Sequence, residues 1–457
     1  MNTAEIKTML LQTLEDLRVS RGVAKVLGDE GMIGHNVLVF ATACLLAACT
    51  SVVTRSEAPI RSTGDIRTYP DQGDHHRGDD NHTGDDHIEP KTTVYGTLSG
   101  TLTLAGSPYR VVGNEQNVVT VPAGSTLVVE PGVVVDFAGS PDVTAADIHA
   151  SSPNTVFDHK LGRVEMRVYG GILVNGADGN RVTFTSTNPW GWYGINFYGP
   201  DSVGDGDPVF NYLVFEKVRK DLYNEDRDWT RGALWAYYWD APVTITHSVF
   251  RNNIAAGKCA ALDLMFSNGS LVEDNLFENN KIFQVDRYGV DGSESYSGGG
   301  AMCITHGQNT VVRGNVFRGN GVASYRMRQA SEENYGELVP RPIQEWPNDA
   351  GRYDLGGGAA LHSFQPSHDL LEDNLFENNF IELGPAAAIY AEDGNTNALT
   401  LRNNRFVNNR AAAGGVIVCN RGRNIDSVVI ESNNVFTGNL AGNSPAPVVS
   451  GDCSFSQ

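Results

Sequence analysis

From Thr93 onward, short apolar runs alternate with polar bends, and one short segment recurs along the chain. Six copies of it place a phenylalanine in one position and an asparagine three residues later. The phenylalanines are Phe250, Phe277, Phe317, Phe376, Phe406 and Phe436; the asparagines are Asn253, Asn280, Asn320, Asn379, Asn409 and Asn439. Five copies have a further asparagine two residues before the phenylalanine: Asn275, Asn315, Asn374, Asn404 and Asn434. This self-similarity predicts stacked units that bury their apolar faces against one another.

Successive phenylalanines are 27, 40, 59, 30 and 30 residues apart. A step of 27 to 30 residues, with runs such as Val243-Thr244-Ile245, predicts one coil of three short strands per repeat. Asparagine suits the bends because it tolerates left-handed backbone and because its amides stack as ladders. We expect the phenylalanines to stack on one another inside the coils.

These repeats resemble the right-handed parallel β-helix of the pectin-lyase-like superfamily. The resemblance covers roughly Thr93 to Ser450 and includes TVPAGSTLVVEPGVVVDF (residues 120–137) and GGILVNGADGNRVTFTSTNPWGWYGINF (170–197), which are similar to the first coils of such proteins. The Gly-rich starts Gly299-Gly300-Ala301, Gly357-Gly358-Ala359 and Gly414-Gly415-Val416 fit the same pattern. The resemblance implies an all-β solenoid over residues 93–457, with long loop insertions on one edge. It says little about function.

Charged residues beside the phenylalanine column alternate in sign from repeat to repeat. One series is Glu216, Arg251, Glu278, Arg318 and Glu377, and the other is Glu273, Arg313, Glu372 and Arg402. Alternation is what a ladder requires when neighbours on successive coils lie about 4.8 Å apart. The repeats are therefore expected to be consecutive coils even across the longer steps, and these charges are expected to be structural.

If the coils are consecutive, the surplus residues must form loops that leave from one edge. The surplus segments are 219–231, 281–298 and 321–356, and they carry aromatic and arginine residues. Aromatic faces stack on sugar rings and arginine pairs with carboxylate or sulfate, so these loops favour an anionic polysaccharide as ligand. The alternatives are that the same side chains pack the loops onto the solenoid or contact another protein. The candidate ligand-binding residues are Trp229, Trp235, Tyr237, Arg287, Tyr288, Arg341, Trp346, Arg352 and Tyr353.

The Gly-led strands beside the loops alternate between inward and outward positions. The inward set is expected to be Leu234, Leu262, Met302, Ala360, Ile389 and Ile417. The outward set is expected to be Trp235, Asp263, Cys303, Leu361, Tyr390 and Val418, followed two residues later by Tyr237, Met265, Thr305, Ser363, Glu392 and Asn420. Asp263 and Glu392 fall three coils apart, about 15 Å, which is too far for a pair of glycosidase carboxylates.

No catalytic constellation stands out. The related lyases and polygalacturonases carry aspartate clusters with an arginine or lysine base, and no matching cluster is found; no catalytic residue is assigned. Asp201, Asp205 and Asp207 are candidate calcium ligands, but a turn explains them better. No cofactor is predicted.

The N-terminal region predicts export and lipidation. An apolar run, VLVFATACLLAA (residues 37–48), has the length of a signal-peptide core, and Leu46-Ala47-Ala48-Cys49 resembles a bacterial lipobox. The resemblance implies cleavage before Cys49, acylation of its thiol, and sorting to the outer membrane. Residues 1–48 would be the signal peptide, with Met32 as an alternative start, and the acidic, histidine-rich segment 49–92 would be a flexible tether. An ordinary buried apolar segment is the other interpretation of 37–48.

The cysteines suggest disulfides in an oxidising compartment. Cys419 and Cys453 are about one coil apart and are the favoured pair, and Cys259 with Cys303 is a second pair; buried free thiols are the alternative.

Composition excludes some functions. With 34 Lys+Arg against 54 Asp+Glu, the net charge is −20, which opposes binding to nucleic acid and to anionic membrane surfaces except through a lipid anchor. The sequence predicts a cell-surface lipoprotein whose solenoid binds carbohydrate. A polysaccharide lyase acting on a uronate polymer, and a structural or adhesive protein that binds another envelope protein, are the alternatives.

Overall fold

The computed structural model describes residues 89–139, 162–188, 191–198, 207–220, 232–237, 241–255, 258–286, 299–327, 338–340, 357–382, 384–392, 399–419, 428–451 and 454–456. All of them belong to one compact unit, Gly64–Gln457. The predicted signal peptide, Cys49 and most of the predicted tether lie outside the described residues.

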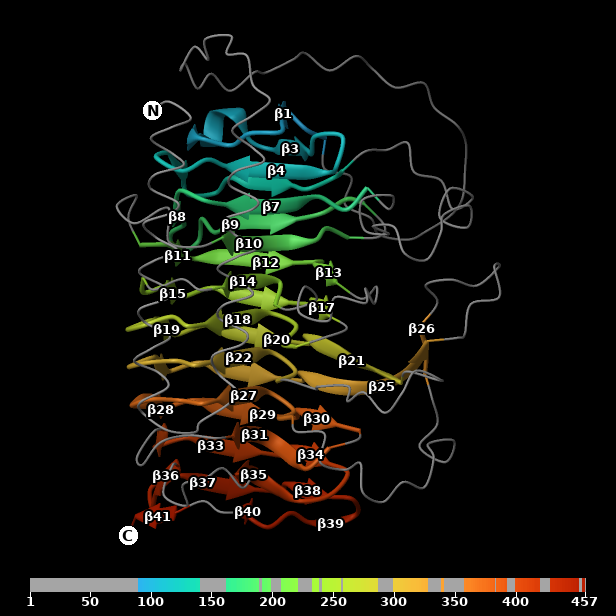
Figure 1. The fold of residues 1–457 in the computed structure, drawn as a ribbon, viewed down its shortest axis with the longest axis vertical. Coiled ribbons are helices and arrows are strands. Elements are labelled where there is room, and N and C mark those ends of the chain that lie inside the picture. Colours follow the sequence, from blue (N-terminus) through green and yellow to red (C-terminus); the bar gives the residue numbers. More distant parts are fainter. Residues whose placement is uncertain are drawn as a thin grey trace, which may run out of the picture. The chain divides into compact units, whose positions relative to one another are not determined.

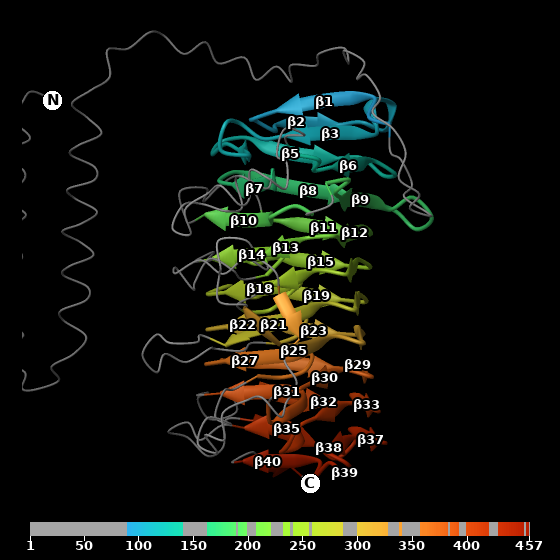
Figure 2. The same cartoon turned by 90° about the vertical axis from the view of Figure 1, so that its right-hand side faces the viewer.

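The described residues form a right-handed parallel β-helix whose strands build four long sheets (Figures 1 and 2). We call these sheets S1 to S4, in the order in which each coil visits them. Apart from β26 and β39, which pair in antiparallel orientation, each strand inside a sheet pairs in parallel with the strand one coil earlier and one coil later, which confirms the fold class expected from the repeats.

Sheet S1 has ten strands: β4 (Val118–Val121), β7 (Glu165–Val168), β10 (Gly194–Tyr198), β14 (Leu234–Tyr237), β18 (Leu262–Met265), β22 (Met302–Thr305), β27 (Leu361–Phe364), β31 (Ala386–Glu392), β35 (Gly415–Cys419) and β40 (Val449–Gly451). Sheet S2 has eleven: β2 (Gly100–Leu102), β5 (Thr126–Val129), β8 (Gly171–Asn175), β11 (Val209–Asn211), β15 (Thr244–Thr246), β19 (Leu271–Glu273), β23 (Val311–Arg313), β28 (Asp369–Glu372), β32 (Leu399–Arg402), β36 (Val428–Glu431) and β41 (Ser454–Ser456).

Sheet S3 also has eleven: β1 (Thr92–Tyr95), β3 (Tyr109–Val112), β6 (Val134–Asp136), β9 (Val182–Thr185), β12 (Leu213–Glu216), β16 (Val249–Arg251), β20 (Leu276–Glu278), β24 (Val316–Arg318), β29 (Leu375–Glu377), β33 (Arg405–Val407) and β37 (Val435–Thr437). A short 3-10 helix, η1 (Leu104–Gly106), lies between β2 and β3.

Sheet S4 is shorter and begins later in the chain: β13 (Arg219–Lys220), β17 (Ile254–Ala255), β21 (Lys281–Asp286), β25 (Gly321–Met327), β30 (Phe380–Ile381), β34 (Arg410–Ala411), β38 (Leu440–Ala441) and β39 (Ser444–Pro445), with β26 (Leu338–Pro340) paired to β25. The expectation of three strands per coil therefore fits the first described coils, and a fourth strand is added from β13 onward. A separate small core forms behind S4 from Ala260, Ile282, Val322, Ala359, Ile381, Ala387 and Ala411.

The phenylalanine column forms a continuous stack of rings within the core. Phe277, Phe317 and Phe376 are cross-strand partners on successive strands of S3, and their rings stack at 4.8 Å between centroids. The stack continues through Phe406 to Phe436. The repeats on either side of the 40- and 59-residue steps are thus adjacent coils, as the sequence predicted.

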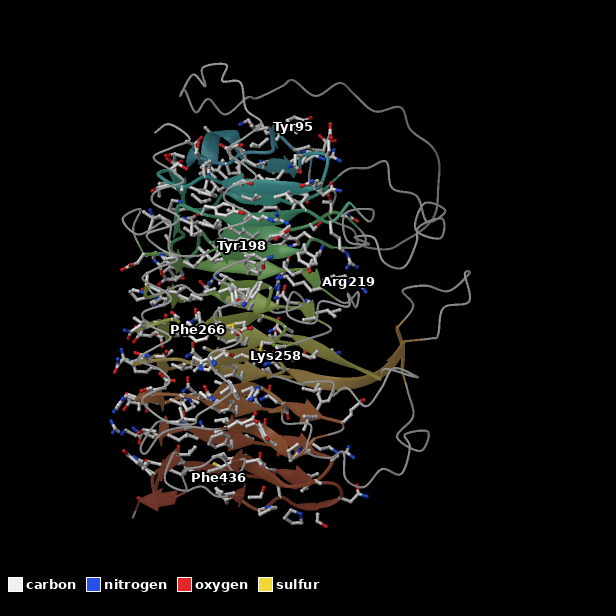
Figure 3. The ribbon with its side chains drawn as sticks, viewed as in Figure 1. Tyr95, Tyr198, Arg219, Lys258, Phe266 and Phe436 are labelled. Carbon is white, nitrogen blue, oxygen red and sulfur yellow. A yellow bond between two sulfur atoms is a disulfide. The ribbon has the colours of Figure 1, made fainter. Side chains whose placement is uncertain are left out.

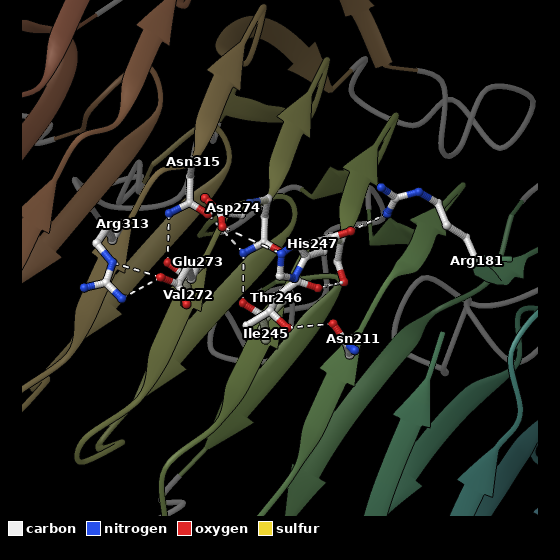
Figure 4. A network of polar contacts seen from close by, with 12 residues as sticks. Arg181, Asn211, Ile245, Thr246, His247, Val272, Glu273, Asp274, Arg313 and Asn315 are labelled. Atoms are coloured by element: carbon white, nitrogen blue, oxygen red, sulfur yellow. Dashed lines mark hydrogen bonds and ion pairs between the residues drawn. The ribbon is translucent and has the colours of Figure 1, made fainter. Parts of the chain in front are cut away.

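Two asparagine ladders lie at the bends that flank S3. In the first ladder, between S2 and S3, the Asn315 side chain donates to the carbonyl of Val272 at 2.8 Å (Figure 4). In the second, between S3 and S4, Asn320 donates to the carbonyl of Phe277 at 2.8 Å. Except before Asn434, the residue that precedes a ladder asparagine is left-handed, for example Asn279 and Asp274, with φ of 55° and 53°. Left-handed backbone and amide stacking, both of which were expected of the same asparagine, are therefore divided between two adjacent residues.

The charge ladders are formed as predicted. Arg318 pairs with Glu278 at 3.8 Å and with Glu377 at 2.9 Å. In the second series, Arg313 donates to Glu273 at 2.9 Å, and Arg402 pairs with Glu372 at 3.3 Å. The second ladder extends one coil further than expected, because Arg402 also contacts Glu431 at 3.0 Å.

One expectation about strand register is wrong. Leu361, not Ala360, lies in the inward column of S1, since it pairs with Met302, and His362 pairs with Cys303 in the outward column. Ser363 therefore points inward, and Phe364 occupies the outward position that was expected for Ser363. The expectation rested on the likeness of two Gly-Gly-Ala segments, whose small side chains constrain the register little. Burial of the large Leu361 side chain decides the register instead.

The insertions leave from one edge, between S4 and S1, as expected. Strands β21 and β25 continue beyond the two-residue length of their neighbours and pair along Lys281–Asp286 and Gly321–Arg326. Strand β26 adds to β25 in antiparallel orientation. In Figure 1 these three strands project away from the stacked coils.

Candidate functional site

The outer face of S1 carries most of the polar and aromatic side chains that a ligand site would need. Its strands place two outward columns side by side, because alternate residues of a strand point to the same face. The first column contains Arg167, Asn196, Trp235, Asp263, Cys303, His362, Tyr390 and Val418; the second contains Tyr198, Tyr237, Met265, Thr305, Phe364 and Glu392.

A polar cluster lies at the N-terminal end of this face and centres on Glu165. Glu165 accepts hydrogen bonds from Arg167 at 2.7 Å, from the Asn196 amide at 2.7 Å and from the Tyr198 hydroxyl at 3.1 Å. Lys220, from S4, is fully buried and donates to the side-chain oxygen of Asn196 at 2.8 Å and to the carbonyl of Gly232 at 2.6 Å. We call Glu165, Arg167, Asn196, Tyr198 and Lys220 the polar cluster.

The cluster fixes the protonation states of its members. Burial alone would raise the pKa of Glu165, but the hydrogen bond and charge of Arg167, with help from Asn196 and Lys220, lower it, so the carboxylate is ionised. Burial and the neighbouring Glu165 raise the pKa of the Tyr198 hydroxyl, which therefore stays protonated at neutral pH. Burial works against the charged form of Arg167, yet its contact with Glu165 raises the pKa of the guanidinium.

The chemistry available here is recognition rather than proton abstraction. A protonated Tyr198 can donate a hydrogen bond but is a poor base. Arg167 keeps 33% of its side chain exposed and lies over the Tyr198 ring at 5.6 Å, so part of its fork remains accessible to an anionic group. Tyr169 stacks on Tyr198 at 5.5 Å, which holds that ring in place (Figure 3 labels Tyr198).

The second column continues from the cluster as a strip of side chains that are half-buried except for Thr305, which is buried. Tyr198 pairs with Tyr237, Tyr237 with Met265, and Thr305 with Phe364 on successive strands. Trp235 and Tyr237 were both predicted to line a groove. Trp235 is only 1% exposed and lies 4.8 Å from the Tyr237 ring, so Tyr237 is the accessible ring of the pair.

The first column, beyond Trp235, is buried although it points outward. Asp263 is 0% exposed, Cys303 1% and His362 5%. His362 lies 3.4 Å from Glu392; burial lowers the pKa of its imidazole more than Glu392 raises it, so the neutral form is favoured. Asp263 and Glu392 are three strands apart along S1, as expected, which is too far for a hydrolase pair.

The cysteines of the described chain are oxidised. Cys259 and Cys303 form a disulfide, the second of the two predicted pairs. Cys419 is also disulfide-bonded. Its predicted partner, Cys453, lies outside the described residues, so that pairing stays a prediction.

Most of the predicted ligand-binding residues cannot be placed. Trp229, Arg287, Tyr288, Arg341, Trp346, Arg352 and Tyr353 lie outside the described residues, as do the calcium candidates Asp201 and Asp205. The polar cluster was not predicted from sequence. Its only signal was the alternation of polar and apolar residues in Glu165-Met166-Arg167 and Ile195-Asn196-Phe197.

Comparison with known proteins adds little to this picture. No protein-family model matches the chain, and no curated protein sequence matches it. Among solved structures, the chain is similar to the A-module of a mannuronan C-5 epimerase from Azotobacter vinelandii, with 12% sequence identity and a TM-score of 0.22 over 80% of this chain and 85% of that one. The fold therefore rests on the strand topology described above. In the part of the chain that the structure describes, no helix has the length and apolar content needed to cross a bilayer.

Proposed function

We propose that the outer face of S1 binds an extended carbohydrate chain, and that anionic chains bind best. The observation that carries this proposal is the continuous strip that runs from Arg167 through Tyr198 and Tyr237 to Met265 on neighbouring coils. The Tyr237 ring offers a face for a sugar, and the Arg167 fork suits a carboxylate or sulfate. Because the whole chain carries a net charge of −20, attraction of a polyanion must come from such local cations.

The first test is a glycan array probed with the full-length chain, followed by affinity measurements on the best ligand. Tyr237→Ala should weaken binding by about 1 kcal/mol, or about fivefold, because it removes an accessible ring. Tyr95→Ala is the matched control, since Tyr95 is a half-exposed tyrosine on S3, away from the strip. Equal affinities for the Tyr237 and Tyr95 variants would count against the proposal.

The loops make a second contribution in this proposal. Trp346→Ala and Arg352→Ala remove the aromatic and cationic groups that the sequence assigned to the groove. Both variants are expected to bind more weakly than the parent protein. If neither does, the proposed loop-lined binding site is wrong.

A polysaccharide lyase acting on a uronate polymer is the second candidate, and the polar cluster favours it. A lyase needs a cation to neutralise the uronate carboxylate, and the partly exposed guanidinium of Arg167 is such a cation. The raised pKa of the Tyr198 hydroxyl favours a binding protein over a lyase, because the base of an elimination must be unprotonated. Incubation with pectate, alginate or chondroitin decides between the two: a lyase generates the ultraviolet absorbance of an unsaturated uronate, and a binding protein leaves the polymer unchanged. Recovery of an envelope protein in a pull-down, without glycan retention, would instead favour an adhesive role.

We also propose that the protein is anchored to the bacterial outer membrane through Cys49. The proposal is supported by the lipobox-like sequence Leu46-Ala47-Ala48-Cys49. Metabolic labelling with a tagged fatty acid should modify the parent protein and not Cys49→Ser. Label on the variant, or none on the parent, would contradict it.

A further inference from the structure

Three potential metal ligands meet on the outer face of S1, beyond the polar cluster. One ligand atom each from Cys259, Asp263 and Cys303 lies within 4.8 Å of the other two. None of the three residues is more than 1% exposed. In the structure the two sulfur atoms form a disulfide, so a fully buried carboxylate lies directly beside it.

The fold holds these residues together whether or not the disulfide exists. Asp263 on β18 and Cys303 on β22 are cross-strand partners in one outward column, where neighbouring side chains are about 4.8 Å apart. Cys259 precedes β18 and has a left-handed backbone (φ 53°) at the bend where the chain enters S1. The backbone hydrogen bonds of Gly232 to the carbonyls of Lys258 and Cys259 hold that bend in place.

We propose that, once the disulfide is reduced, Cys259, Asp263 and Cys303 bind a divalent transition metal of the zinc type. Two thiolates and one carboxylate are ligands that zinc accepts in tetrahedral sites. His362, the cross-strand partner of Cys303, is the next side chain in the column, but its Nε2 lies 3.4 Å from Glu392 and it is not one of the three residues that meet within 4.8 Å. The fourth position would be taken by water, as in zinc sites with three protein ligands. The proposal does not depend on carbohydrate binding.

The chemistry balances with a thiol or phosphine as reductant. Reduction adds two electrons and two protons to the sulfur–sulfur bond and gives two thiols. A thiol reductant becomes a disulfide, and a phosphine becomes a phosphine oxide by taking its oxygen from water, which also supplies the two protons. Metal binding then releases the two thiol protons to solvent. Two thiolates, one carboxylate and a divalent cation sum to a charge of −1, the same as the disulfide with one ionised Asp263, so the metal form adds no buried charge.

The test uses Co²⁺ as a spectroscopic substitute for zinc, on the full-length chain before and after treatment with a phosphine. A thiol titration should first show that the folded protein gains two thiols that the Cys259→Ser/Cys303→Ser double variant does not. Co²⁺ should then produce sulfur-to-cobalt charge-transfer bands in the reduced parent, and none in the oxidised parent or in the reduced double variant. That comparison separates this pair from the chain's four other cysteines.

Asp263→Asn tests the carboxylate and should weaken Co²⁺ binding by about tenfold or more. Asp274→Asn, an exposed aspartate one strand away in the chain, is the matched control and should bind as the parent does. Circular dichroism of each oxidised variant checks that it folds. The proposal is overturned if the two thiols do not appear in the folded protein, if the reduced parent gives no charge-transfer bands, if the double variant keeps them, or if Asp263→Asn binds like the control.

Discussion

The side chain of each buried ladder asparagine completes the hydrogen bonds of the corresponding bend on the preceding coil. The Asn320 amide donates to the carbonyl of Phe277 at 2.8 Å and to Asn379 at 3.1 Å. Its oxygen accepts from the backbone and side-chain nitrogens of Asn280, at 3.0 and 2.9 Å. Because no water reaches this position, these backbone groups have no replacement partner in its absence.

Asn320→Ala is therefore expected to lower the free energy of unfolding by about 3 kcal/mol, since it leaves a buried carbonyl and a buried amide unpaired. Asn434→Ala, at the half-exposed end of the other ladder, should cost about 1 kcal/mol, because water can reach the groups it exposes. Thermal denaturation followed by circular dichroism measures both. Equal losses for the two variants would show that ladder position has no effect.

Asp369 is a second residue whose environment has a measurable consequence. Burial raises its pKa from 3.8 to about 7, although its carboxylate accepts a hydrogen bond from the Thr310 amide at 2.8 Å. A carboxyl group with a raised pKa contributes its full stability below the unfolded pKa and loses it as pH rises towards the folded pKa. Between about pH 4 and about pH 7, this group should therefore cost the fold up to about 4 kcal/mol.

Asp369→Asn keeps an oxygen for the Thr310 amide and removes the charge. The variant should have a higher melting temperature than the parent at pH 7 and above, and its melting temperature should vary less between about pH 4 and about pH 7. Asp373→Asn, at an exposed left-handed position nearby, serves as the control. If both variants follow the parent's pH profile, the raised pKa of Asp369 is refuted.

At the scale of a strand, the charge ladders select the register more than they stabilise the fold. The side chains of Arg318, Glu278 and Glu377 remain 45%, 30% and 28% exposed, so solvent screens their attraction. Strands of S3 are three or four residues long, and a slip by one residue would turn the phenylalanine column outward. The ladder adds an electrostatic penalty for slips that keep the phenylalanine column facing inward and that the apolar core therefore does not oppose.

Arg318→Ala should accordingly lower the free energy of unfolding by only about 0.5 kcal/mol at low salt, and by less at high salt. Arg318→Glu should cost more than Arg318→Ala, because three carboxylates would then follow one another on S3. Urea denaturation at two salt concentrations measures both effects. A loss for Arg318→Ala that does not change with salt would contradict a Coulombic origin.

At the scale of the whole solenoid, the sequence predicted the features that recur with a distinctive residue type and missed those that do not. The phenylalanine stack, the asparagine ladders and the charge pairs were predictable, because each repeats at one position on several coils. The register of Leu361 was not, because alanine and glycine next to it carry no packing information. Sheet S4 was missed because its strands are mostly two residues long.

The candidate site was predicted only in part. The edge from which the insertions leave followed from the surplus lengths, and Tyr237 lies on the predicted face of S1. The polar cluster was missed because Glu165, Asn196 and Lys220 come from three separate strands, in coils that lack the Phe–Asn repeat. Only the three-dimensional winding brings these residues together.

Because charge alternates along S3, removing an odd number of coils brings like charges together, whereas removing an even number keeps opposite charges together. Deleting residues 273–312 removes one coil and brings Arg251 next to Arg318, whereas deleting residues 273–371 removes two and brings Arg251 next to Glu377. Both truncations remove Cys303 and leave Cys259 single, and the longer one also removes β25 and β26, so the response of each to salt, rather than its absolute stability, reports the sign of the new neighbour. Added salt should stabilise the odd truncation, by screening a repulsion, and destabilise the even one, by screening an attraction. A solenoid of this kind therefore changes its length most readily two coils at a time.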